Sequence, residues 1–183
     1  LTTNDPPSVQ AQPGAGPRHF AFHPNGRYVF VINELDSTLS SYAYDADNGR
    51  LAPIHTASTL PAGWDGENSG ADLHLAPSGR FAYGSNRGHN SIAVFAIDEQ
   101  TGRFTIIEHV ATQGATPRNF ALDPAGEWLI VANQTSNTLV TLRVDRESGK
   151  LTATGNALEV PSPVCVMFLQ LSAEVVEQPT SQA

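Results

Sequence analysis

The sequence predicts an all-β fold built from a repeated four-stranded unit, and two observations support this prediction. A segment of similar residues occurs three times, at 18–27, 71–80 and 118–127, and its prolines lie 53 and 47 residues apart. The spacing inside each copy is also constant, with a turn glycine, an asparagine seven residues later and a second glycine sixteen residues after that. Repeats of this length indicate stacked supersecondary units.

The first copy shows how a unit divides into four strands. One apolar run ends at a Pro-x-Gly turn, a second covers 28–32, a third covers 38–44, and a fourth follows Gly49. The Pro-x-Gly turn and the glycine-containing segment 45–49 both supply residues that favour turns. Because no helical periodicity is sustained, we expect very little helix.

Four-stranded units that recur in this way are typical of the blades of a β-propeller. We predict a partial β-propeller over 1–169, with blades at about 16–59, 69–114 and 116–160. Three blades do not close a ring. The segment 161–169 is expected to be a closing inner strand whose partners lie upstream of Leu1, and 170–183 a polar C-terminal tail.

The composition argues against several classes of function. Eighteen acidic and ten basic residues give a net charge of −8, which disfavours nucleic acid, and no apolar run is long enough for a membrane helix. The single cysteine, Cys165, cannot form an internal disulfide, and its apolar neighbours predict a buried thiol. His19 and His23 lie too far apart along a strand to share a metal ion.

Hairpin topology selects the candidate site residues. The start of the first strand and the end of the second lie at the same end of a unit, and the inner strands of all blades surround one channel. We therefore expect one channel mouth to collect Arg18, His19, Glu34, Asp72, Arg87 and Arg118. The recurring asparagines are expected to cap turns, whereas the next position changes from Glu34 to Arg87 to Gln134 and is free to be functional. Exposed surface charge is the alternative interpretation.

Several motifs resemble one known family. They are Gly16-Pro17-Arg18-His19, Asn33-Glu34-Leu35, Ser85-Asn86-Arg87-Gly88-His89-Asn90-Ser91, Thr116-Pro117-Arg118 and Pro161-Ser162-Pro163-Val164-Cys165. In these motifs the chain is similar to the lactonases that include bacterial 6-phosphogluconolactonase and carboxymuconate cycloisomerase. The resemblance implies a seven-bladed propeller, of which this chain would be the C-terminal part.

The resemblance also implies an activity: hydrolysis of 6-phosphoglucono-1,5-lactone to 6-phosphogluconate in the cytoplasm, as part of the pentose phosphate pathway, without metal or organic cofactor. The ligand would be a small anionic sugar lactone. Arg18, Glu34 and Arg87 would be catalytic, with the arginines on the anion or oxyanion and Glu34 moving a proton. His19, Asp72 and Arg118 are expected to bind substrate.

A further histidine of the family would belong to an earlier blade, so the isolated chain is expected to be inactive. A lactonising cycloisomerase and a non-catalytic binding scaffold remain alternatives, and the sequence leaves the oligomeric state open.

Overall fold

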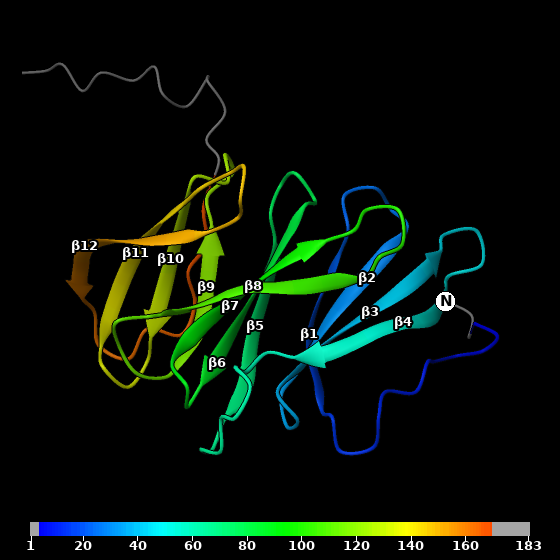
Figure 1. The fold of residues 1–183 in the computed structure, drawn as a ribbon, viewed down its shortest axis with the longest axis horizontal. Helices are drawn as coiled ribbons and strands as arrows, with labels where there is room; N and C mark the ends of the chain where they lie inside the picture. The colour runs from blue at the N-terminus through cyan, green and yellow to red at the C-terminus, as the bar shows by residue number, and fades with distance from the viewer. Residues whose placement is uncertain (1–3, 170–183) are drawn as a thin grey trace, which may run out of the picture.

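Three four-stranded antiparallel sheets make up the computed structural model, which describes residues 4–169 (Figure 1). The first sheet contains β1 (Pro17–Phe22), β2 (Tyr28–Asn33), β3 (Thr38–Asp45) and β4 (Arg50–Ser58). The second contains β5 (Ser69–Leu75), β6 (Phe81–Arg87), β7 (Ser91–Ile97) and β8 (Phe104–Ala111). The third contains β9 (Pro117–Leu122), β10 (Trp128–Asn133), β11 (Thr138–Val144) and β12 (Leu151–Glu159). The strand order confirms the predicted blades.

The strand register confirms that the three units are structural repeats. The pairs Phe20↔Val31, Leu73↔Gly84 and Phe120↔Val131 occupy equivalent positions in the ladders of the three inner hairpins. Within the described part of the chain there is no helix, and therefore none long and apolar enough to cross a membrane.

The inner strands lie next to one another, with contacts between β1 and β5 and between β5 and β9 (Figure 1). The core fills the two spaces between neighbouring sheets. Leu73 packs with side chains of the first sheet and Phe120 with those of the second, and both are almost fully buried. The equivalent Phe20 is 64% exposed, because within residues 4–169 no sheet packs on that face of the first blade.

In the second and third sheets, the turn between the third and fourth strands contains a glycine. An aromatic ring of the preceding sheet packs against this glycine. Gly149 has φ +74°, and a Cβ at this position would lie 2.4 Å from Phe81; Gly102 has φ +70°, and a Cβ there would lie 2.6 Å from Tyr28. A larger residue would have to displace a buried ring. The repeated glycine is therefore part of the contact between blades.

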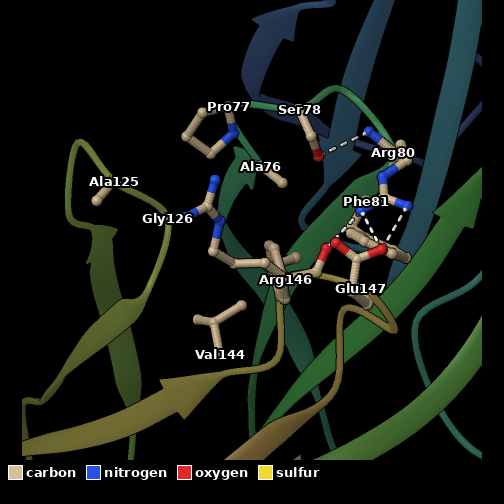
Figure 2. Close-up of a pocket in the computed structure, with 11 residues that line it drawn as sticks. Ala76, Pro77, Ser78, Arg80, Phe81, Ala125, Gly126, Val144, Arg146 and Glu147 are labelled. Carbon is tan, nitrogen blue, oxygen red and sulfur yellow. Dashed lines mark hydrogen bonds and ion pairs between the residues drawn. The ribbon is translucent and has the colours of Figure 1, made fainter.

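Arginine side chains strengthen the same end of these interfaces. Arg80 donates to the Arg146 carbonyl at 2.6 Å and pairs with Glu147 at 3.4 Å, while Arg27 binds the Glu99 carbonyl in the equivalent place. Figure 2 shows Arg80 beside Glu147 at the groove of about 300 Å³ between the second and third sheets. This groove lies at the Pro-x-Gly end of the blades, which Pro77 marks, away from the predicted site.

One expectation about the C-terminal region, a buried thiol at Cys165, is not met, whereas the closing strand at 161–169 stays a prediction. Residues 161–169 form no strand, because no strand of the described region pairs with them; the Val166 amide instead donates to Asn119 Oδ1 at 2.6 Å. Cys165 is exposed and not buried, since without a ladder and a covering layer its neighbours form no core. The role of this segment as a closing strand stays a prediction, and the predicted tail at 170–183 lies outside the described residues.

Replacing Gly149 with alanine should destabilise the protein markedly. The new methyl group would overlap Phe81, at a cost of about 1 to 3 kcal/mol, and the positive φ adds about 1 to 2 kcal/mol. Gly155→Ala is the matched control, because Gly155 also has a positive φ but has open space around its Cα. Urea denaturation should show a clearly larger loss for Gly149→Ala; equal losses would mean that the ring contact contributes nothing.

Candidate functional site

The inner strand of every blade contains a β-bulge at its first residues. In β1 the register shifts between Pro17 and His19, so that Arg18 is the extra residue, and β9 shifts in the same way at Arg118. In β5 the shift falls between Gly70 and Leu73. A bulge turns a side chain away from the ordinary alternation of a strand. It therefore allows Arg18 to reach the Ala71 carbonyl of the neighbouring blade.

Arg18, Glu34 and Arg87 form one ion-pair cluster between the first two sheets. Arg87 Nη2 lies 2.5 Å from Glu34 Oε1, and Arg18 Nε lies 3.5 Å from Glu34 Oε2. Arg18 Nη1 also donates to the Ala71 carbonyl at 2.5 Å, and Arg87 Nη2 to the Gly70 carbonyl at 3.0 Å. The backbone of β5 thus fixes both guanidinium groups.

The charges in this cluster influence one another. The hydrogen bond from Arg87 is the main cause that lowers the pKa of Glu34, and the charges of Arg87 and Arg18 add to it. Burial, followed by the charge of Arg87, lowers the pKa of Arg18, while Glu34 acts in the opposite direction. The charge of Arg118 affects both groups, so this third arginine lies close to the cluster. Arg18 and Arg87 both pair with the single carboxylate of Glu34, so the cluster has an excess of positive charge.

Part of the donor capacity of this cluster is unused. The buried Nε of Arg87 has no hydrogen-bond partner among the described residues. A buried donor without a partner is costly, so it marks a position at which an added acceptor would be favourable. A carboxylate, a phosphate or a developing oxyanion is the type of acceptor that guanidinium groups bind well.

Asp72 lies beside this cluster, and its buried carboxylate receives donors from all three sheets. Its Oδ1 accepts from His19 Nδ1 at 2.6 Å, and its Oδ2 from Asn119 Nδ2 at 2.5 Å and the Phe120 amide at 3.1 Å. His74 Nε2 lies 3.3 Å from Oδ2. Burial by itself raises the pKa of Asp72, but the hydrogen bond and charge of His74, and then the other donors, lower it to about 2.

Three repeat-equivalent residues are therefore joined in series across the three blades. They are His19, Asp72 and Asn119, and Asn119 Oδ1 continues the chain by accepting from Val166. The side chain of Asp72 is only 5% exposed and both of its oxygens accept hydrogen bonds from protein donors. Asp72 thus holds neighbouring groups in place, and its predicted contact with substrate stays a prediction.

Most of the predicted site residues lie close together in the structure. The structure brings together Arg18, Glu34 and Arg87, with Arg118 nearby and His19 in contact with Arg18. The repeated Asn33, Asn86 and Asn133 are buried and donate to residues of the adjacent turns and loops, which agrees with a capping role.

Sequence reasoning missed two members of this region. His74 and Asn119 were not selected as binding residues, although Asn119 occupies the same repeat position as His19 and Asp72. That shared position was the available signal. Residues 4–169 contain no group of three side chains placed as metal ligands.

Repeated antiparallel blades and inner strands that lie side by side define a β-propeller, and the charged cluster at the bulged strand ends is its candidate site. Residues 1–168 match the family described as lactonase, 7-bladed beta-propeller, and the chain belongs to this family.

Named relatives are consistent with this membership. The chain is 40% identical to a 6-phosphogluconolactonase of Bacillus subtilis over 86% of its own length and 45% of the relative's. It is 46% identical to a 6-phosphogluconolactonase of Formosa agariphila over 68% of its length and 35% of the relative's. The solved periplasmic gluconolactonase PpgL of Pseudomonas aeruginosa superposes with a TM-score of 0.89 and 36% identity, over 94% of this chain and 47% of that structure. The chain thus spans about half the length, or less, of these relatives.

Acid should destabilise the protein through Asp72. Its pKa is lowered from 3.8 to about 2 in the folded state, so the stabilisation is complete above about pH 4 and is lost as the pH falls toward 2. The loss should be on the order of 2 kcal/mol. Unfolding followed from pH 5 to pH 2 should show this loss in the wild type and in Glu147→Gln, a substitution of an exposed carboxylate, but not in Asp72→Asn. An unchanged acid profile in Asp72→Asn would contradict it.

Proposed function

We propose that the protein containing this chain is a lactonase like 6-phosphogluconolactonase, which opens 6-phosphoglucono-1,5-lactone to 6-phosphogluconate in the pentose phosphate pathway. The observation that carries this proposal is the pair Arg18 and Arg87, held by Glu34 and by backbone carbonyls. The names of the relatives support the same activity. Because the chain spans about half of them, the proposal concerns the whole protein.

We assign Arg18 and Arg87 the role of stabilising the oxyanion that forms on the lactone carbonyl. When water attacks a lactone carbonyl, negative charge develops on the carbonyl oxygen, and preorganised donors lower the barrier by stabilising it. Both guanidinium groups are mostly buried, with side chains 17% and 14% exposed, so solvent screens their charge only in part. The unpaired Nε of Arg87 would gain an acceptor when substrate binds.

Glu34 is better suited to orienting the arginines than to taking up a proton. Each of its oxygens faces a guanidinium group, and its pKa is lowered chiefly by the hydrogen bond from Arg87. A carboxylate with a lowered pKa is a weaker base at neutral pH. We therefore assign Glu34 the role of holding Arg18 and Arg87 in one geometry.

Hydrolysis of an unphosphorylated sugar lactone is a second candidate. It is favoured by the similarity to the Pseudomonas protein that is described as a periplasmic gluconolactonase. The two candidates differ in one phosphate group, which carries negative charge at neutral pH, and Arg118 is the additional cation close to the cluster. A phosphorylated lactone would fit a cytoplasmic enzyme, because a charged phosphate ester does not readily cross an apolar membrane.

Removing either principal arginine should abolish most of the activity. Arg18→Ala or Arg87→Ala in the full-length protein should lower lactone turnover by about 30- to 1000-fold, since a charge-assisted contact to an oxyanion contributes about 2 to 4 kcal/mol. The measurement is hydrolysis of 6-phosphoglucono-1,5-lactone, corrected for spontaneous opening. Arg103→Ala, which removes an exposed arginine, is the control.

Three outcomes of that assay are decisive. Wild-type rates in both arginine variants would refute the site. No turnover by the full-length wild type would refute the lactonase proposal and favour a binding scaffold. The isolated 183-residue chain should show little turnover, and full activity in it would show that the rest of the protein is dispensable.

Arg118 should decide between the two lactones. Arg118→Ala should raise KM for the phosphorylated lactone by about 10-fold or more, as expected for the loss of a charged hydrogen bond of about 1.5 to 3 kcal/mol. The same variant should leave kinetics on glucono-1,5-lactone nearly unchanged. An equal loss on both substrates would show that Arg118 does not recognise the phosphate.

A further inference from the structure

His19 is held between a carboxylate and a guanidinium group, and the two contacts involve different ring nitrogens. Nδ1 lies 2.6 Å from Asp72 Oδ1, and Nε2 lies 3.2 Å from Arg18 Nη1. Asp72 is ionised above about pH 2 and accepts a hydrogen bond, so Nδ1 carries the proton. A guanidinium group can only donate, so Nε2 presents its lone pair. This network assigns the neutral tautomer with a hydrogen on Nδ1.

This arrangement is the one required of a base. A histidine oriented by a buried carboxylate through one nitrogen can accept a proton at the other, and the carboxylate stabilises the imidazolium that forms. The His19 side chain is 43% exposed, whereas that of Asp72 is 5% exposed. The ring can therefore meet water and ligand, while the carboxylate that orients it remains enclosed.

The other acidic or basic side chains of the cluster are less suited to this task. Both oxygens of Glu34 face arginines, and Asp72 has all its acceptor positions directed at protein donors. His74 shares the carboxylate of Asp72, but through Nε2 at the longer distance of 3.3 Å, and its ring packs against Phe120 with centroids 4.8 Å apart.

We propose that His19 is the general base of the lactonase reaction and that Asp72 is its positioning residue; this inference rests on the proposed function. His19 Nε2 takes a proton from water as the water oxygen forms a bond to the lactone carbonyl carbon, and the carbonyl π electrons move to the oxygen. Arg18, whose Nη1 lies beside Nε2, stabilises that oxyanion. When the oxyanion collapses, the bond from the carbonyl carbon to the ring oxygen breaks, and the ring oxygen receives the proton from His19.

The position of Arg18 links substrate binding to this step. Arg18 Nη1 lies 3.2 Å from His19 Nε2 and can donate a hydrogen bond to its lone pair. A substrate oxygen that takes over this donor releases the lone pair next to the carbonyl carbon. Asn119, which binds the other oxygen of Asp72, keeps the carboxylate from rotating.

The decisive experiment compares histidine variants of the full-length protein. His19→Gln retains a donor for Asp72 but lacks a usable base, so kcat on 6-phosphoglucono-1,5-lactone should fall by about 10²- to 10⁴-fold with little change in KM. In His19→Ala, added imidazole should restore part of the turnover, which a structural role would not allow. His55→Gln, which changes a histidine of β4 outside the cluster, is the matched control and should keep most of its activity.

Asp72→Asn tests the positioning role. Its kcat should fall by about 10- to 100-fold at nearly constant KM, as for other residues that orient a reactive group through a hydrogen bond. Should this variant fail to fold, the His19 variants still decide the proposal. Near-wild-type kcat in His19→Gln, or no rescue of His19→Ala by imidazole, would overturn the role of His19 while leaving the lactonase function intact. Absence of activity in the wild type would overturn both.

Discussion

The buried carboxylate of Asp72 is the interaction on which the arrangement of the three blades depends. A charge removed from water is tolerated only when hydrogen bonds and opposite charges replace its hydration. Here those donors come from His19 in the first sheet, from Asn119 and the Phe120 amide in the third, and from the second sheet itself. The sheets must therefore keep their relative positions for Asp72 to stay ionised. The same positions set the spacing of the arginines.

The two ends of each blade serve different purposes. At the Pro-x-Gly end, repeated glycines and aromatic rings join neighbouring sheets, as Gly149 does with Phe81. At the other end the first residues of the inner strands form a different pair in each blade, namely Arg18-His19, Ala71-Asp72 and Arg118-Asn119. Repeated residues thus maintain the scaffold, and residues that vary at equivalent positions supply the chemistry. This separation lets one backbone pattern hold three different sets of functional groups.

The internal repeat was sufficient to predict the three four-stranded sheets, because spacing between turns fixes hairpins locally. Hairpin topology also placed Arg18, Glu34 and Arg87 at the same end of their blades. The hydrogen bonds of Asp72 could not be predicted, since they depend on the distance between sheets and on bulges that leave no pattern in a single strand. The prediction for Cys165 failed because apolar neighbours bury a thiol only where another layer covers them.

The bulge in each inner strand also affects how the protein can evolve. A bulged residue has no direct partner in the ladder, so a substitution there leaves the pairing of the neighbouring strands unaltered. Arginine occupies this place in two of the blades, and Ala71 lies in the bulged segment of the other. Ala71 is fully buried, so the room for other side chains lies at the two arginine positions, which are only partly buried. Natural variation or directed evolution could install new reactive groups at those two positions one at a time, without first having to rebuild the fold.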